Sequence, residues 1–178
     1  PDMAEAHNNL GVAYKKQGDM KRAMEHFELA LEHQPEFAEA FCNLGNALNK
    51  TGDLEGAIEK MRRAIELDPE YASAFTNLGD AQSKLGLFDD AVASHRQAIA
   101  IDPDHADAHR NLSMVLLLLG QLGEGFAEYE WRTRSDDFLS LSGDIDGPPW
   151  DGRNPGGKTI LLRPEQGFGD AIQFIRYA

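Results

Sequence analysis

The chain has little cysteine, few basic residues and no long apolar run, and each shortage excludes a class of protein. Of its 178 residues only Cys42 is a cysteine, so no disulfide can form within the chain and a reducing compartment is expected. The 17 lysines and arginines stand against 30 aspartates and glutamates, which gives a net charge of −13. Such a chain lacks the basic stripe that nucleic-acid binding requires. Its dispersed acidic residues form a solubilising surface or attract a basic partner.

The apolar runs are too short to cross a membrane. The longest candidate extends from Met114 to Leu119, whereas a membrane span needs about 18 residues. We therefore expect a soluble, cytoplasmic protein that binds neither membranes nor nucleic acid. The chain starts at Pro1 with no initiator methionine or signal peptide and stops within a helical pattern. We expect it to be a piece of a longer protein.

A repeat of 34 residues organises most of the chain. The positions that recur are Pro1, Pro35, Pro69 and Pro103, Leu10, Leu44, Leu78 and Leu112, and Gly18, Gly52, Gly86 and Gly120. The recurring glycine divides each unit into two stretches whose apolar residues follow helical spacing. Gly18 followed by Asp19 predicts a left-handed helix end and then a helix N-cap, and Pro35 predicts the end of the second helix. Each unit is therefore predicted to be a helical hairpin.

The recurring positions within one unit carry a resemblance to a known family. Leu10, Gly11, Tyr14, Ala23, Phe27, Ala30 and Pro35 match the pattern of the tetratricopeptide repeat. The resemblance implies an all-α fold, a right-handed superhelical solenoid with a concave groove, over residues 1–134. This region would hold the tail of an earlier repeat, three full repeats and a fourth that degenerates after its first helix. Gly125 and Arg132 replace the two small alanines there, so we expect the array to end.

A column of asparagines is the main candidate for a binding site. It consists of Asn9, Asn43, Asn77 and Asn111, one in the first helix of each unit. Asparagine is a mediocre helix former, so its recurrence in mid-helix calls for a reason. Helical geometry turns the column about 100° away from Leu10, Leu44 and Leu78, which we expect to face the core. The asparagines then either read the backbone of an extended peptide or bond a neighbouring helix or water.

A lysine column follows the asparagines on the same helical face. Lys16, Lys50 and Lys84 lie seven residues beyond the first three asparagines, within about 20° of them. These lysines either line the groove or complement the helix dipole at the end of each first helix. The asparagine column resembles that of the repeat domain of O-GlcNAc transferases, which implies a polypeptide ligand. A clamp for C-terminal carboxylates is not expected, because only Arg110 among Asn8, Cys42, Thr76 and Arg110 is basic.

The histidines give no metal site in the sequence. His105 and His109 are four residues apart and could share a helical face, but no catalytic metal motif surrounds them. We expect surface histidines, no bound metal and no cofactor in this fragment.

The last part of the chain has a different character. Residues 135–157 are rich in glycine and proline and predict an irregular connector. Residues 158–178 predict a short strand, a turn containing Gly167 and Gly169, and a helix. Such a turn can approach a phosphate, although glycine also serves packing at turns of this kind.

Three segments in order resemble a bacterial family in which tetratricopeptide repeats precede a heptosyltransferase-like glycosyltransferase domain. They are residues 129–132, 149–152 and 157–170. The resemblance implies that Asp170 is a candidate general base, with a nucleotide-sugar bound in the full-length parent. Asp170 also suits a helix cap, and 20 residues cannot make an active site. We therefore expect a protein-binding module, a substrate-recruiting arm of a glycosyltransferase. The alternative is an assembly scaffold, such as a homo-oligomer, without a peptide-substrate role.

Overall fold

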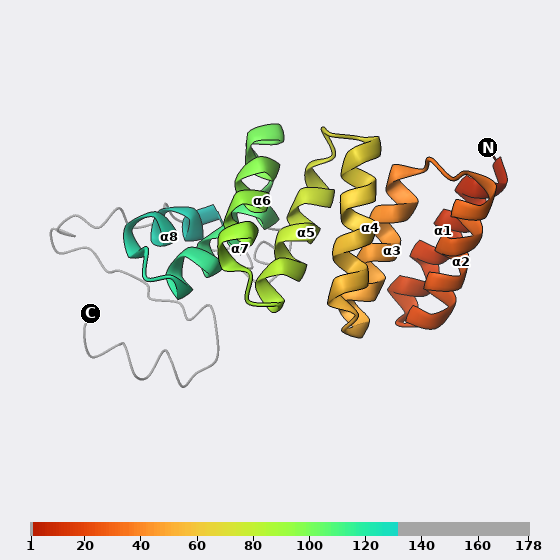
Figure 1. Cartoon of the computed structure of the whole chain (residues 1–178), viewed down its shortest axis with the longest axis horizontal. Coiled ribbons are helices and arrows are strands. Elements are labelled where there is room, and N and C mark those ends of the chain that lie inside the picture. The colour runs from red at the N-terminus through yellow and green to blue at the C-terminus, as the bar shows by residue number, and fades with distance from the viewer. Residues whose placement is uncertain (1, 132–178) are drawn as a thin grey trace, which may run out of the picture. The chain divides into compact units, whose positions relative to one another are not determined.

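The repeated sequence folds into helices that follow one another along an array (Figure 1). The structure, a computed structural model, describes residues 2–131. In this part the helices are α1 (Asp2–Gln17), α2 (Met20–His33), α3 (Ala38–Thr51), α4 (Leu54–Leu67), α5 (Ala72–Lys84), α6 (Phe88–Ile101), α7 (Ala106–Leu118) and α8 (Leu122–Tyr129). The predicted connector and strand-loop-helix, residues 135–178, lie outside the described residues.

Glycine makes the turn inside each hairpin. Gly18, Gly52, Gly86 and Gly120 have φ angles of +83°, +93°, +78° and +75°, a left-handed conformation that side chains with a Cβ rarely adopt. Asp19 and Asp53 then cap α2 and α4 by accepting hydrogen bonds from the backbone N–H groups of Arg22 and Gly56. The predicted hairpin turn is thus confirmed.

Close packing inside the first three hairpins depends on a second glycine, which is Gly11, Gly45 or Gly79. A Cβ at Gly11 would lie 2.5 Å from the Phe27 ring, and a Cβ at Gly79 would lie 2.6 Å from the His95 ring. The first helix therefore receives the large side chain of the second helix directly against its backbone.

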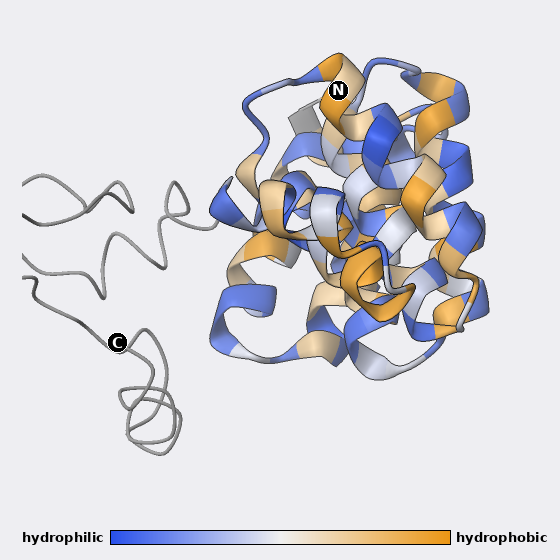
Figure 2. Cartoon of the chain, turned by 90° about the vertical axis from the view of Figure 1, so that its left-hand side faces the viewer, coloured by the Kyte–Doolittle hydropathy of each residue, from blue (hydrophilic) through white to orange (hydrophobic). Residues whose placement is uncertain are grey.

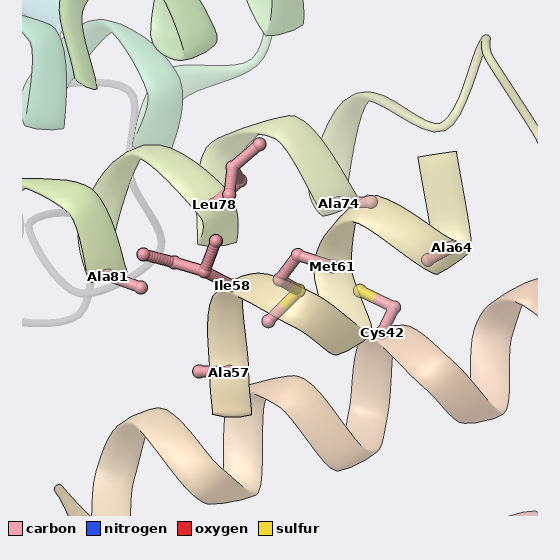
Figure 3. Packing of buried hydrophobic residues seen from close by; sticks show 8 residues of the cluster. All are labelled: Cys42, Ala57, Ile58, Met61, Ala64, Ala74, Leu78 and Ala81. Carbon is pink, nitrogen blue, oxygen red and sulfur yellow. The ribbon is translucent and has the colours of Figure 1, made fainter. Parts of the chain in front are cut away.

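Neighbouring hairpins share their cores. Figure 3 shows one cluster, in which side chains of the second hairpin meet those of α5. Its members are Cys42, Ala57, Ile58, Met61, Ala64, Ala74, Leu78 and Ala81. Each hairpin buries its apolar face against the next, as expected for a solenoid of repeats. The predicted all-α solenoid fold is confirmed for the part of the chain that the structure describes.

The first helices of the hairpins lie on the inner side of the array. Helix α3 contacts α1 and α5, and α5 contacts α7. Among the eight described helices, by contrast, the second helices of successive hairpins do not contact one another. The array therefore bends with α1, α3, α5 and α7 inside.

One detail differs from the sequence-based expectations. Leu10 is 46% exposed, whereas Leu44 is buried with Ala23 and Phe27 of the hairpin before it. Among the described residues no hairpin precedes α1, so Leu10 lacks the neighbours that bury Leu44. In the fourth unit, which we expect to degenerate after its first helix, the second helix α8 has 8 residues, against 14 in α2.

Candidate protein-binding face

Four side chains on each first helix form a stripe, and the four stripes together are called the inner face here. They are Glu5, Asn9, Val12 and Lys16 on α1, Glu39, Asn43, Asn46 and Lys50 on α3, Ser73, Asn77, Asp80 and Lys84 on α5, and Asp107, Asn111, Met114 and Leu118 on α7. Their spacing keeps the members of one stripe within about 60° around the helix. None of these residues is buried. The predicted asparagine and lysine columns thus lie on one face of the array.

Asn43 is tied to the helix before it. Its carboxamide oxygen accepts a hydrogen bond from Lys15 Nζ at 3.0 Å, and its carboxamide nitrogen donates to Asn8 Oδ1 at 3.0 Å. Asn8 in turn donates to Glu39 Oε1 at 2.9 Å. These bonds connect α1 and α3 and hold the Asn43 carboxamide in one orientation.

Asn77 repeats this arrangement one hairpin further along. Its nitrogen lies 3.4 Å from Cys42 Sγ, and its oxygen accepts from Asn46 Nδ2 at 3.2 Å. Cys42 occupies the position that Asn8 has in the first unit, so the contact is the same, with sulfur as a weaker acceptor. The contact with the preceding helix, one of the two roles expected for the asparagines, is therefore present at Asn43 and Asn77.

The asparagines are not saturated by these bonds. A carboxamide has two N–H donors and an oxygen with two lone pairs. In the part of the chain that the structure describes, Asn43 and Asn77 each use one donor and one lone pair. Each therefore keeps one donor and one acceptor for a ligand. Asn9 is exposed and Asn111 is half-buried.

The lysine column differs from one member to the next. Lys16 and Lys50 are exposed. Lys84 donates to Asp80 Oδ2 at 2.9 Å and to Asn49 Oδ1 at 2.9 Å. Lys15 beside the column is half-buried, and burial, followed by repulsion from Lys50, lowers the pKa of its ammonium group. The lysines thus form a positive edge along the ends of α1, α3 and α5.

The residues immediately before the asparagines do not form a basic clamp. Asn8, Cys42 and Thr76 are buried between the first helices, and only Arg110 is half-exposed. Burial raises the pKa of the Cys42 thiol, although the hydrogen bond from Asn77 opposes this effect. A thiol that is buried and protonated is a packing residue and a poor nucleophile.

Sequence reasoning missed several members of the face. Asn46, Asp80, Met114 and Leu118 occupy the same helical face as the asparagine and lysine columns. The signal for these residues was the 34-residue repeat itself. Asn46, Asp80 and Met114 each lie three residues after an asparagine of the column, and Leu118 lies 34 residues after Lys84. It was overlooked because the residue type changes from one unit to the next.

The prediction of surface histidines was wrong for His109. Its ring is 6% exposed, stacks on Trp131 with ring centroids 3.8 Å apart, donates from Nε2 to the Pro103 carbonyl and bonds Glu128 through Nδ1. Glu128 and Trp131 come from α8 and the turn that follows it, which a motif search around His109 does not reveal. His105 is half-buried at the start of α7. Over the described residues no group of three or more metal-ligating side chains comes together.

The fold and its inner face define a helical-repeat protein. Its hairpins are tetratricopeptide repeats, because models of this repeat match residues 4–37, 26–59 and 76–132, and a model described as TPR repeat matches residues 45–86. A curated relative, Protein FlbA of Caulobacter vibrioides, is 37% identical over 60 residues, which are 34% of this chain and 10% of FlbA. The matched region thus spans a small part of that relative. No described helix is long and apolar enough to span a bilayer.

Solved structures share the solenoid. A thermophilic TPR protein of Thermus thermophilus has a TM-score of 0.70 at 23% identity, covering 75% of each chain. An O-GlcNAc transferase of Thermobaculum terrenum, solved as a mutant, has a TM-score of 0.63 at 27% identity, with 65% of this chain and 22% of that chain covered. The first TPR domain of Spaghetti, bound to an HSP90 peptide, has a TM-score of 0.65 at 19% identity, with 67% of this chain and 94% of that chain covered.

Proposed function

We propose that the chain binds an extended polypeptide along its inner face. The observation that carries this proposal is the pair of carboxamides at Asn43 and Asn77, each held in place by one donor and one acceptor bond and each left with one donor and one acceptor. A peptide unit offers the complementary N–H and C=O whatever its side chain. The face therefore suits a partner recognised through its backbone.

Preorganisation strengthens this argument. A flexible asparagine loses rotamer freedom when it binds, which lowers affinity. Here Lys15 and Asn8 already fix Asn43, and Asn46 and Cys42 already fix Asn77. The tetratricopeptide neighbour that was solved with a bound peptide supports a peptide ligand for this fold. Because three of the four clamp positions hold buried, non-basic residues, the contact proposed here is to the interior of a chain and needs no free carboxylate.

We further propose that the repeats recruit acceptor polypeptides for a glycosyltransferase of the bacterial cytoplasm. Support comes from the resemblance of residues 129–132, 149–152 and 157–170 to a family with such a domain, and from the likeness to an O-GlcNAc transferase. In this proposal Asp170 is the general base, and Gly167 and Gly169 approach the phosphates of a nucleotide-sugar in the full-length protein. These three residues lie outside the described part of the chain.

Assembly is the second candidate function, and one observation favours it. Leu122 and Phe126 of α8 are 56% and 58% exposed, whereas Ile58, which corresponds to Phe126, is buried against α5. Exposed apolar side chains of this size can join copies of a chain into a homo-oligomer. Sedimentation of the parent chain and of the Phe126→Ser variant tests this second function. An oligomer of the parent that is lost in the Phe126→Ser variant would support assembly.

The proposed function is tested by a peptide array probed with the chain and with a variant carrying both Asn43→Ala and Asn77→Ala. We expect broad binding with loose sequence preference, weakened in the double variant by about 1 to 3 kcal/mol because ligand hydrogen bonds are lost. Gln82→Ala is the matched control. Gln82 is buried and bonds Ser94 at 2.7 Å away from the inner face, so its loss affects stability alone. Equal binding by the double variant and the parent would refute the proposal.

A further inference from the structure

The chemistry of the inner face changes at the fourth hairpin. The column that holds Lys16, Lys50 and Lys84 on α1, α3 and α5 continues on α7 as Leu118. The neighbouring column, with Asn46 and Asp80, continues as Met114. Leu118 is 70% exposed and Met114 is 57% exposed. The inner face thus has a polar length, with its lysines along one edge and Glu5 and Glu39 along the other, followed by an apolar end.

The two apolar side chains act as one patch. Met114 and Leu118 are four residues apart in α7, so their side chains are neighbours on the helix surface. Figure 2 looks at the array from its α8 end and shows orange, apolar stretches of ribbon there beside blue, polar ones. Clustered apolar side chains on an otherwise polar face are typical of a contact that a partner covers. The methionine adapts to side chains of different shape.

The positive edge beside this patch is available to a partner. Within the part of the chain that the structure describes, Lys16 and Lys50 form no ion pair with a carboxylate. Only Lys84 has one, to Asp80 at 2.9 Å, and both of these side chains are well exposed. A surface pair of this kind is weak and can exchange partners. In a chain with a net charge of −13, three lysines in one column form a positive edge, although Glu5 and Glu39 lie on the same stripes at the other ends of α1 and α3.

We propose that the polypeptide bound by the inner face carries a large apolar side chain that seats on Met114 and Leu118, and acidic side chains that meet Lys84, Lys50 and Lys16 in turn. This inference rests on the proposed function and names the chemistry of its ligand. The apolar residue supplies affinity through burial, and the acidic residues fix register and speed association. An apolar partner without charge would leave the lysine column unused.

The geometry sets a spacing for such a ligand. Helices in contact lie about 8 to 10 Å apart, and an extended chain advances about 3.3 Å per residue. One step from a first helix to the next therefore corresponds to about three residues of the ligand. The expected motif is a leucine, methionine or phenylalanine with acidic residues following at intervals of about three.

The experiment measures binding of the 178-residue chain to labelled synthetic peptides by fluorescence polarisation. One peptide has a leucine and three glutamates at the predicted spacing, and its reversed sequence covers the other chain direction. Two altered peptides serve as comparisons. In one of them lysine replaces each glutamate, and in the other serine replaces the leucine. Leu118→Ser and Lys50→Glu alter the two halves of the site, and Arg62→Glu on an exposed position of α4 is the matched control. All three positions are exposed, and circular dichroism checks that the variants stay folded.

We expect the leucine-glutamate peptide to bind about tenfold or more tightly than either altered peptide. Leu118→Ser should abolish the preference for leucine, Lys50→Glu should reduce the preference for glutamate, and Arg62→Glu should change neither. Equal affinity for the leucine-glutamate peptide and both altered peptides, or preferences that survive both inner-face variants, overturns the inference. If the array shows binding that depends on Asn43 and Asn77 while these preferences are missing, the proposed function stands and this inference alone fails. If the folded chain binds neither array nor peptides, both fail.

Discussion

The carboxamide of Asn43 donates to the carboxamide oxygen of Asn8 at 3.0 Å, across the contact between α3 and α1. Asn8 is 2% exposed, while its neighbour Asn9 is exposed on the inner face. Two adjacent asparagines in one helix therefore have different tasks. The buried residue joins one repeat to the next, and we propose that the exposed one serves a ligand.

This difference predicts separate effects of two alanine substitutions. Asn8→Ala leaves the Asn43 donor and the Glu39 acceptor without their partner, so we expect the free energy of unfolding to fall by about 1 to 3 kcal/mol. Asn9→Ala should change stability by less than about 0.5 kcal/mol, as surface substitutions usually do. Urea unfolding of both variants measures this. Equal destabilisation by the two would show that the hydrogen bonds of Asn8 do not join the repeats.

His95 predicts a pH dependence of stability. Its ring is 0% exposed, and neither ring nitrogen has a hydrogen-bond partner among residues 2–131. The corresponding positions of the earlier units hold Phe27 and Met61. Burial lowers the pKa of His95 from 6.5 to about 4, with Asp80 raising it and His105 lowering it further. The folded state thus keeps His95 neutral where the unfolded chain binds a proton.

This difference in proton binding determines whether stability rises or falls with pH. The stability that the neutral His95 ring contributes is fully present above pH 6.5 and is lost as the pH falls toward about 4. At most it amounts to about 3 kcal/mol. His95→Met, which restores the residue type of the second unit, should lose less stability than the parent between about pH 7 and pH 5. Urea midpoints at both pH values test this, and identical pH profiles for parent and variant would contradict it.

Glycine substitutions should rank by what each new Cβ meets. In Gly11→Ala the Cβ would lie 2.5 Å from the rigid Phe27 ring, whereas in Gly45→Ala it would lie 2.8 Å from the flexible end of Met61. We expect Gly11→Ala to cost about 1 to 3 kcal/mol. Gly45→Ala should cost less, because the end of Met61 can rotate and only the Ala57 carbonyl oxygen, 3.1 Å from the new Cβ, must then shift by a few tenths of an ångström. Melting temperatures measure the ranking, and a larger loss in Gly45→Ala would show that the Phe27 ring can move aside.

The hairpins could be predicted from the sequence because their signals are local. A glycine such as Gly52 fixes a left-handed turn and Asp53 caps the next helix, and both act within a few residues. The inner face was predictable in part, since helical periodicity places Asn43 and Lys50 on one side. The bond from Asn43 to Asn8 and the burial of His109 under Trp131 were not predictable, because they depend on partners supplied by other helices. Leu10 was expected in the core because the repeat pattern is the same in every unit, whereas its burial depends on side chains of a preceding hairpin, such as those that cover Leu44.

The most direct test of the central claim is photo-crosslinking to a peptide selected on the array. A photoreactive amino acid replaces Ser73, exposed on the inner face of α5, or in a separate protein Arg62, exposed on α4. If the inner face binds the polypeptide, the probe at position 73 captures the peptide and the probe at position 62 does not. Capture from position 62 alone, or equally from both positions, would contradict binding along the first helices.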